Sequence, residues 1–157
     1  MKKLLAMGIA LLSVFFFTAC SSEDGPSGNA EGTYTVERTI EMRLPPSIPF
    51  MPVTHQTKLT IKAVNENYVN ISLPGATYTL EGETMDLPSF TLVNIPVMDD
   101  GNGGVMIPHH EFSQKVDKKP VIGVIEGSID SDNELELKVE FQYGSMPFYM
   151  IHTYVSL

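Results

Sequence analysis

The chain has 157 residues, with 19 acidic and 10 basic side chains and a net charge of −9 when histidine is neutral. So acidic a protein is a poor candidate for binding nucleic acid or an anionic lipid surface, and we expect no nucleic-acid partner. The chain contains one cysteine, which excludes a disulfide within it, and no tryptophan.

A basic start and a short apolar segment open the chain. Lys2 and Lys3 precede residues 4–17, which have the length of a signal-peptide hydrophobic region and are short for a bilayer span. The segment ends in Phe17-Thr18-Ala19-Cys20, which resembles a lipobox, the motif of bacterial lipoproteins in which a cysteine receives diacylglycerol. We predict a signal peptide over 1–19 and lipidation of Cys20. The alternatives are an ordinary signal peptide that contains a cysteine and a buried N-terminal helix.

Cleavage before Cys20 would leave 157 less 19, or 138 residues, which suits one domain with its own core. Eight basic residues would remain against 19 acidic ones, a net charge of −11. Acylation would use the only thiol, so catalysis or metal binding by cysteine is excluded. Residues 21–31 carry no large apolar side chain, and we predict a flexible, lipidated tether over 20–31 and a folded domain over 32–157.

The tether also suggests a location. Ser21-Ser22-Glu23-Asp24 resembles the serine-plus-acid signal that sends lipoproteins to the cell surface in some Gram-negative anaerobes. Two buried acyl chains hold a protein stably in a membrane. We therefore expect an outer membrane lipoprotein at the cell surface, or otherwise one that faces the periplasm.

From residue 32 onward, apolar side chains recur at every second position, which is the period of a β-strand. The alternation is clear over 53–64, 68–73 and 135–143, and we expect one strand from Met85 to Val97. Arg38 interrupts the apolar face of the first strand. No segment has a convincing helical period.

The short turns between these segments indicate consecutive hairpins. The sequence therefore predicts an all-β fold, an up-and-down antiparallel barrel of about eight strands that is lipocalin-like and can hold one small ligand. A two-sheet β-sandwich is the alternative, because short strands at this spacing fit it as well.

Several short sequence segments support the prediction of a barrel. The domain starts with Gly32-Thr33-Tyr34, a Leu-Pro-Ser-Phe-Thr-Leu-Val-Asn-Ile-Pro-Val segment spans residues 87–97, and a turn at 127–130 precedes the Leu-x-Leu-x-Val strand at 135–139. This order resembles the calycin-like β-barrel domain of lipoproteins from gut anaerobes, over residues 32–157. The resemblance implies the fold and carries no catalytic motif. Calycins such as lipocalins bind small apolar molecules, which is an analogy at the level of the fold.

His109-His110-Glu111 is the most suggestive polar cluster. On a strand, His109 and Glu111 would share one face, but two ligands are too few for a metal site, and His55 or His152 would join them only through the tertiary fold. The chain has no Gly-x-Ser-x-Gly motif. A hydrolase would need His109 or His110 to meet an acid and a nucleophile in a cleft. We therefore expect no enzyme activity, no metal and no cofactor.

Apolar residues at or near turns are candidates for the rim of a binding site, because such positions are normally polar. They are Phe50, Met51, Met146, Phe148 and Met150. The sequence thus favours a membrane-anchored barrel that binds a small apolar ligand. The alternative is a structural or protein-interaction module with a solid barrel core and a partner protein in the cell envelope.

Overall fold

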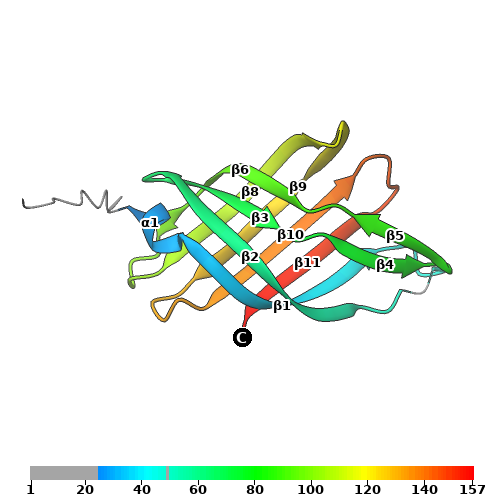
Figure 1. Cartoon of the computed structure of the whole chain (residues 1–157), viewed down its shortest axis with the longest axis horizontal. Coiled ribbons are helices and arrows are strands. Elements are labelled where there is room, and N and C mark those ends of the chain that lie inside the picture. The colour runs from blue at the N-terminus through cyan, green and yellow to red at the C-terminus, as the bar shows by residue number, and fades with distance from the viewer. Residues whose placement is uncertain (1–24, 49) are drawn as a thin grey trace, which may run out of the picture.

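The structure is a computed structural model that describes residues 25–48 and 50–157. The predicted signal peptide, Cys20 and the start of the predicted tether lie outside the described residues. Nine antiparallel strands form a nearly closed barrel, and two more form a separate small sheet (Figure 1). The elements are α1 (Pro26–Ala30), β1 (Gly32–Arg43), β2 (Val53–Asn65), β3 (Tyr68–Leu73), β4 (Ala76–Leu80), β5 (Glu83–Leu87), β6 (Phe90–Pro96), β7 (Met98–Asp99), β8 (Val105–Val116), β9 (Lys119–Ile129), β10 (Leu135–Tyr143) and β11 (Tyr149–Ser156).

The strand order in the barrel is β6-β3-β2-β1-β11-β10-β9-β8-β7, so strands lie beside their neighbours in sequence except where β1 meets β11 and where β3 meets β6 across the intervening hairpin. That pairing joins the two ends of the chain, from Val36 opposite Ser156 to Arg43 opposite Tyr149. The all-β, antiparallel barrel is as predicted, and the sandwich alternative is wrong. The count of about eight strands is corrected to nine in the barrel sheet and two outside it.

Alternating side chains fill the barrel interior. Inward positions of β1 and β10, such as Val36, Ile40, Leu137, Val139 and Phe141, are completely buried. Outward positions on the same strands are polar, mostly threonines and charged residues. Burial of each such aliphatic or aromatic side chain stabilises the fold by roughly 1.5–3 kcal/mol, so this interior is the main source of stability.

Two glycines in β9 allow the sheet to coil tightly. A Cβ at Gly127 would lie 3.0 Å from the Leu137 Cα, and one at Gly123 would lie 2.7 Å from the Phe141 Cα. Both neighbours belong to β10, which pairs with β9 at these positions. Glycine inside a strand marks a place where another backbone approaches closely, and here it is the partner strand itself.

The barrel is incomplete between β6 and β8. β7 pairs with the start of β8 and places Met98 opposite Met106. Two residues further along, the same register would place Pro96 opposite Pro108, and neither proline has the N–H that a continued ladder needs. The side-chain amide of Gln114 instead donates to a β6 carbonyl 2.8 Å away. This seam explains why the barrel is only nearly closed.

The end of the barrel near the N-terminus is covered by α1, which the sequence did not predict (Figure 1). Ser27 and Ala30 are buried, and the Ala30 carbonyl accepts a hydrogen bond of 2.9 Å from the Tyr34 hydroxyl. Residues 26–30, expected to belong to a flexible tether, therefore pack on the barrel, and the fold begins before Gly32. Within the described part of the chain, no helix is long and apolar enough to cross a membrane.

The β4–β5 hairpin lies at the other end of the barrel (Figure 1). Its strands pair only with each other, while Ala76, Tyr78 and Leu87 are buried in the core cluster. The Tyr78 hydroxyl donates to the Met146 sulfur at 3.8 Å, which connects the hairpin to the β10–β11 loop. The hairpin is thus a cover packed on the barrel through side chains alone.

Candidate functional site

The charged side chain of Arg38 lies inside the barrel wall with only 2% of its surface exposed. It occupies an inward position of β1, directly opposite His55 of β2 and Tyr154 of β11. A guanidinium is always charged in proteins, and burial of a charge is costly unless the group is fully hydrogen-bonded. So costly a residue in a mainly apolar interior marks a candidate functional site.

Neutral groups satisfy the Arg38 guanidinium. Its Nη1 donates to the carbonyls of Pro74 and Gly75, at 2.8 and 3.0 Å, where the chain leaves β3 for the hairpin. Its Nε donates to His55 Nε2 at 3.1 Å, and Nη2 contacts the same ring nitrogen. Among the described residues, no carboxylate forms an ion pair with Arg38.

The contact with Arg38 fixes the protonation of His55. A guanidinium cannot accept a hydrogen bond, so His55 Nε2 must be the acceptor and the ring must be neutral. Burial lowers the pKa of His55, and the Arg38 charge lowers it further. The histidine therefore serves Arg38 as a neutral acceptor in place of a carboxylate.

His152 and Tyr154 extend the polar cluster along β11. His152 Nδ1 lies 3.1 Å from the Tyr154 hydroxyl, and its Nε2 has no hydrogen-bond partner among the described residues. Burial, with smaller effects of Arg38 and His55, lowers the pKa of His152 to about 3. Burial raises the pKa of Tyr154 to about 12, against the opposing effects of the Arg38 charge and hydrogen bond. Both side chains are therefore neutral at physiological pH.

A hollow of about 520 Å³ reaches this cluster from the side of the barrel. Residues 53–59 of β2 pair with β1 but not with β3, whose pairing with β2 begins at Thr60. This unpaired edge and the base of the hairpin border the hollow, which is lined by Arg38, His55, Gly75, Ala76, Thr77, Asp86 and Leu87. A second hollow, of about 670 Å³, lies between β5 and the β10–β11 loop.

The residues predicted to bind a ligand differ widely in burial. Met150 is fully buried in the core, whereas Met51 is 83% exposed. Phe50 and Met146 are half-buried and pack against the core, and Phe148 is half-buried in the β10–β11 loop. None of the five lines the Arg38 hollow, and only Met146 lines the second one.

The predicted cluster at residues 109–111 is divided between the two faces of β8. His109 and Glu111 share the exposed face, as expected, whereas His110 is half-buried opposite the buried Ile125 of β9. His109 is exposed and contacts Glu126 on β9 at 3.1 Å. Neither His55 nor His152 joins it, since both lie beside Arg38. No group of three or more potential metal ligands occurs within residues 25–48 and 50–157.

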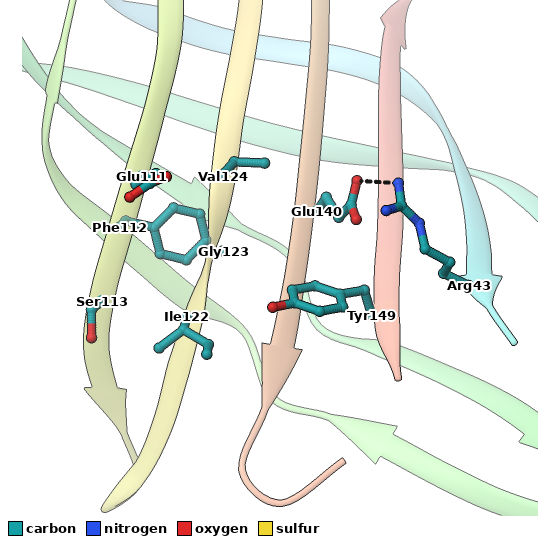
Figure 2. A pocket seen from close by; sticks show the side chains of 9 residues that line it. All are labelled: Arg43, Glu111, Phe112, Ser113, Ile122, Gly123, Val124, Glu140 and Tyr149. Atoms are coloured by element: carbon teal, nitrogen blue, oxygen red, sulfur yellow. Dashed lines mark hydrogen bonds and ion pairs between the residues drawn. The ribbon is translucent and has the colours of Figure 1, made fainter. Parts of the chain in front are cut away.

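A third hollow, of about 750 Å³, lies on the outer face of the sheet (Figure 2). Ile122 and Val124 of β9 and Tyr149 of β11 provide its apolar surface. At its border, Arg43 forms an ion pair of 2.9 Å with Glu140. Gly123, which permits the close approach of β10, also lines this hollow.

One signal in the sequence pointed to Arg38: the residue interrupts the apolar stripe of its strand. His55 likewise stands on the alternating face that continues to Leu59 and Ile61. The link between the two follows from strand register, which the pattern of apolar residues does not specify.

The fold defines this protein as a nearly closed antiparallel β-barrel with a buried arginine at a side opening. No family model and no curated protein matches the chain, and its membership of the calycin-like family is not shown. The barrel is similar to the crystal structure of "a putative outer membrane protein" from Bacteroides fragilis NCTC 9343, with a TM-score of 0.67 and 19% identity. The match covers 83% of this chain and 51% of the other, so the chain spans about half the length of that protein. The likeness establishes the fold.

Proposed function

We propose that the chain is an exported lipoprotein, anchored in the outer membrane through a lipid on Cys20, whose barrel binds a small, largely apolar ligand without catalysis. The lipobox-like sequence and the similar outer membrane protein support the location. Strands β1 and β2 carry threonine, glutamate and lysine on their outward face, the reverse of the apolar band around membrane-spanning barrels. A polar outward face is consistent with a barrel that is attached to the membrane by a lipid and does not span it.

One observation carries the ligand-binding proposal. The β4–β5 hairpin covers the barrel end without backbone pairing to it, and both the Arg38 hollow and the second hollow border it. Concave sites of a few hundred Å³ with apolar walls and a few polar groups are typical of small-molecule binding. Because side chains fill the centre of the barrel, we place the ligand at the end that the hairpin covers.

Replacement of the lipidated cysteine tests the anchor. In cells that carry Cys20→Ser, the protein should leave the membrane fraction and lose incorporation of labelled palmitate, because serine cannot form the thioether. Ser21→Ala, which leaves the thiol in place, is the matched control and should remain in the membrane fraction. An unchanged membrane fraction for Cys20→Ser would refute the anchor.

A neutral fluorescent probe tests the hollow. The mature chain with Cys20→Ser should bind N-phenyl-1-naphthylamine saturably. Thr77→Trp places a large ring in the Arg38 hollow and should weaken binding by at least about tenfold, which corresponds to 1.4 kcal/mol. Thr79→Trp changes an exposed threonine on the same strand that does not line the hollow, and it should bind as the parent does. Equal weakening by both variants would contradict the assigned position.

A second candidate function is an interaction module of the cell envelope with a solid barrel core. The filled interior and the outer hollow in Figure 2 favour it, because Ile122 is 41% exposed beside the Arg43–Glu140 pair. An exposed apolar surface with a charged rim is typical of a protein contact. Failure of the neutral probe to bind, with the fold intact, would favour this second function.

A further inference from the structure

The edge of Arg38 that carries Nε and Nη2 has a single hydrogen-bond acceptor. The Nε and Nη2 donors of a guanidinium lie parallel and match the two oxygens of a carboxylate. In this barrel both donors meet one ring nitrogen, His55 Nε2. One acceptor therefore stands where two acceptors would fit.

The electrostatic surroundings of this edge also favour an anion. Both backbone carbonyls that pair with Arg38 lie on Nη1, at the other side of the guanidinium. Asp86 is the carboxylate that lines the hollow, and it accepts a 2.7 Å hydrogen bond from Thr77 instead of pairing with Arg38. The buried Nε2 of His152, close enough to Arg38 for the charge to affect its titration, has no partner among the described residues. No carboxylate among the described residues thus forms an ion pair with the positive charge of the cluster.

We propose that the Arg38 hollow binds the carboxylate of a small amphipathic acid, whose two oxygens replace His55 Nε2 on the Nε–Nη2 edge. This inference rests on the proposed function and adds the chemical class of its ligand. The hydrocarbon part of the acid lies against Ala76 and Leu87 at the base of the hairpin, which line the same hollow. Charge-assisted bonds to the two oxygens are stronger than the bonds to the neutral ring.

The position of His55 allows its side chain to move away from Arg38. It is half-buried on the part of β2 that has no β3 partner, and it lines the hollow. Its ring can rotate toward solvent without breaking a backbone hydrogen bond. The histidine then acts as a stand-in acceptor that keeps the guanidinium satisfied while no acid is bound.

Competition with the neutral probe tests the assignment on the mature chain with Cys20→Ser. Dodecanoate should displace N-phenyl-1-naphthylamine at a concentration about ten- to a hundredfold lower than 1-dodecanol, which has the same chain length and no charge. In Arg38→Gln the two compounds should bind equally. Arg43→Gln removes an exposed arginine on the outer face and should keep the parent preference.

A second variant keeps the test decisive even if Arg38→Gln does not fold. His55→Ala empties the Nε–Nη2 edge, so dodecanoate should bind several-fold more tightly while 1-dodecanol is unaffected. If Arg38→Gln lacks the circular dichroism spectrum of the parent, His55→Ala decides alone, and unchanged dodecanoate binding would overturn the proposal.

The outcomes separate this inference from the proposed function. Equal binding of acid and alcohol by the parent would overturn the carboxylate site and leave apolar ligand binding intact. Tighter binding of dodecyl phosphate than of dodecanoate would overturn the assignment to a planar anion. Failure of the acid, the alcohol and the neutral probe alike would overturn both proposals.

Discussion

Gly123→Ala is expected to prevent the chain from folding. The added Cβ would lie 2.7 Å from both Cα and Cβ of Phe141 and closer still to the Glu140 carbonyl oxygen. These atoms belong to the backbone and core of β10, which cannot retreat without breaking its ladder with β9. We expect a loss of more than about 4 kcal/mol, a large share of the 5–15 kcal/mol that stabilises a typical domain.

Gly32→Ala is the matched control for this prediction. Gly32 is also a strand glycine, but the nearest atom to its added Cβ is Tyr34 Cε2 at 3.4 Å, an ordinary van der Waals contact. The expected change is within about 1 kcal/mol and can be stabilising, because alanine reduces the entropy of the unfolded chain. Urea unfolding followed by circular dichroism measures both variants. A cooperative transition of Gly123→Ala near the midpoint of the parent would contradict the prediction.

The strands with regular alternation could be predicted from the sequence. The bounds of β3 and β10 are those expected, Tyr68–Leu73 and Leu135–Tyr143. Both strands are bordered by short polar or proline-glycine turns, and alternation with period two is uninterrupted within them. Local signals suffice where pattern and turns agree.

The middle of the chain could not be predicted in the same way. The residues from Met85 to Val97, expected to form one strand, are divided between β5 and β6, which lie in different sheets, and the strand is interrupted between them from Pro88. Asn94, with a φ of 54°, adds an irregularity where β6 pairs with β3. Apolar periodicity indicates which side chains are buried but not in which sheet, since hairpin and barrel share one core.

The candidate site shows the same limit. The sequence revealed that Arg38 breaks an apolar stripe, yet its partners His55 and Tyr154 depend on the register of two different strand pairs. The apolar residues at turns were more conspicuous in the sequence, but the fold distributes them between core and surface. A costly residue at an inward position was the better signal of the site, because it must have partners that only the tertiary structure supplies.

Stability is expected to fall steeply as the pH is lowered below about 6.5, because of His152. The folded chain keeps this buried histidine neutral, with a pKa of about 3, while its ordinary value is 6.5. Between these two values the unfolded chain binds more protons than the folded one, so acid favours unfolding. The stabilising effect is fully present above 6.5 and decreases as the pH falls toward 3. Each pH unit within this window costs up to about 1.4 kcal/mol, and hence about 2 kcal/mol between 6.5 and 5.

His152→Phe isolates this contribution. Phenylalanine retains an aromatic ring against Phe141, whose centroid lies 5.1 Å from that of His152, and it cannot take up a proton. The free energy of unfolding in urea, measured at several pH values from 4 to 8, should therefore depend less steeply on pH in the variant below 6.5. The slope is the quantity to compare, because loss of the contact with the Tyr154 hydroxyl changes the absolute stability. Parallel curves for the two proteins would show that the fold does not resist protonation of His152, and the neutral cluster around Arg38 would then lack one of its members.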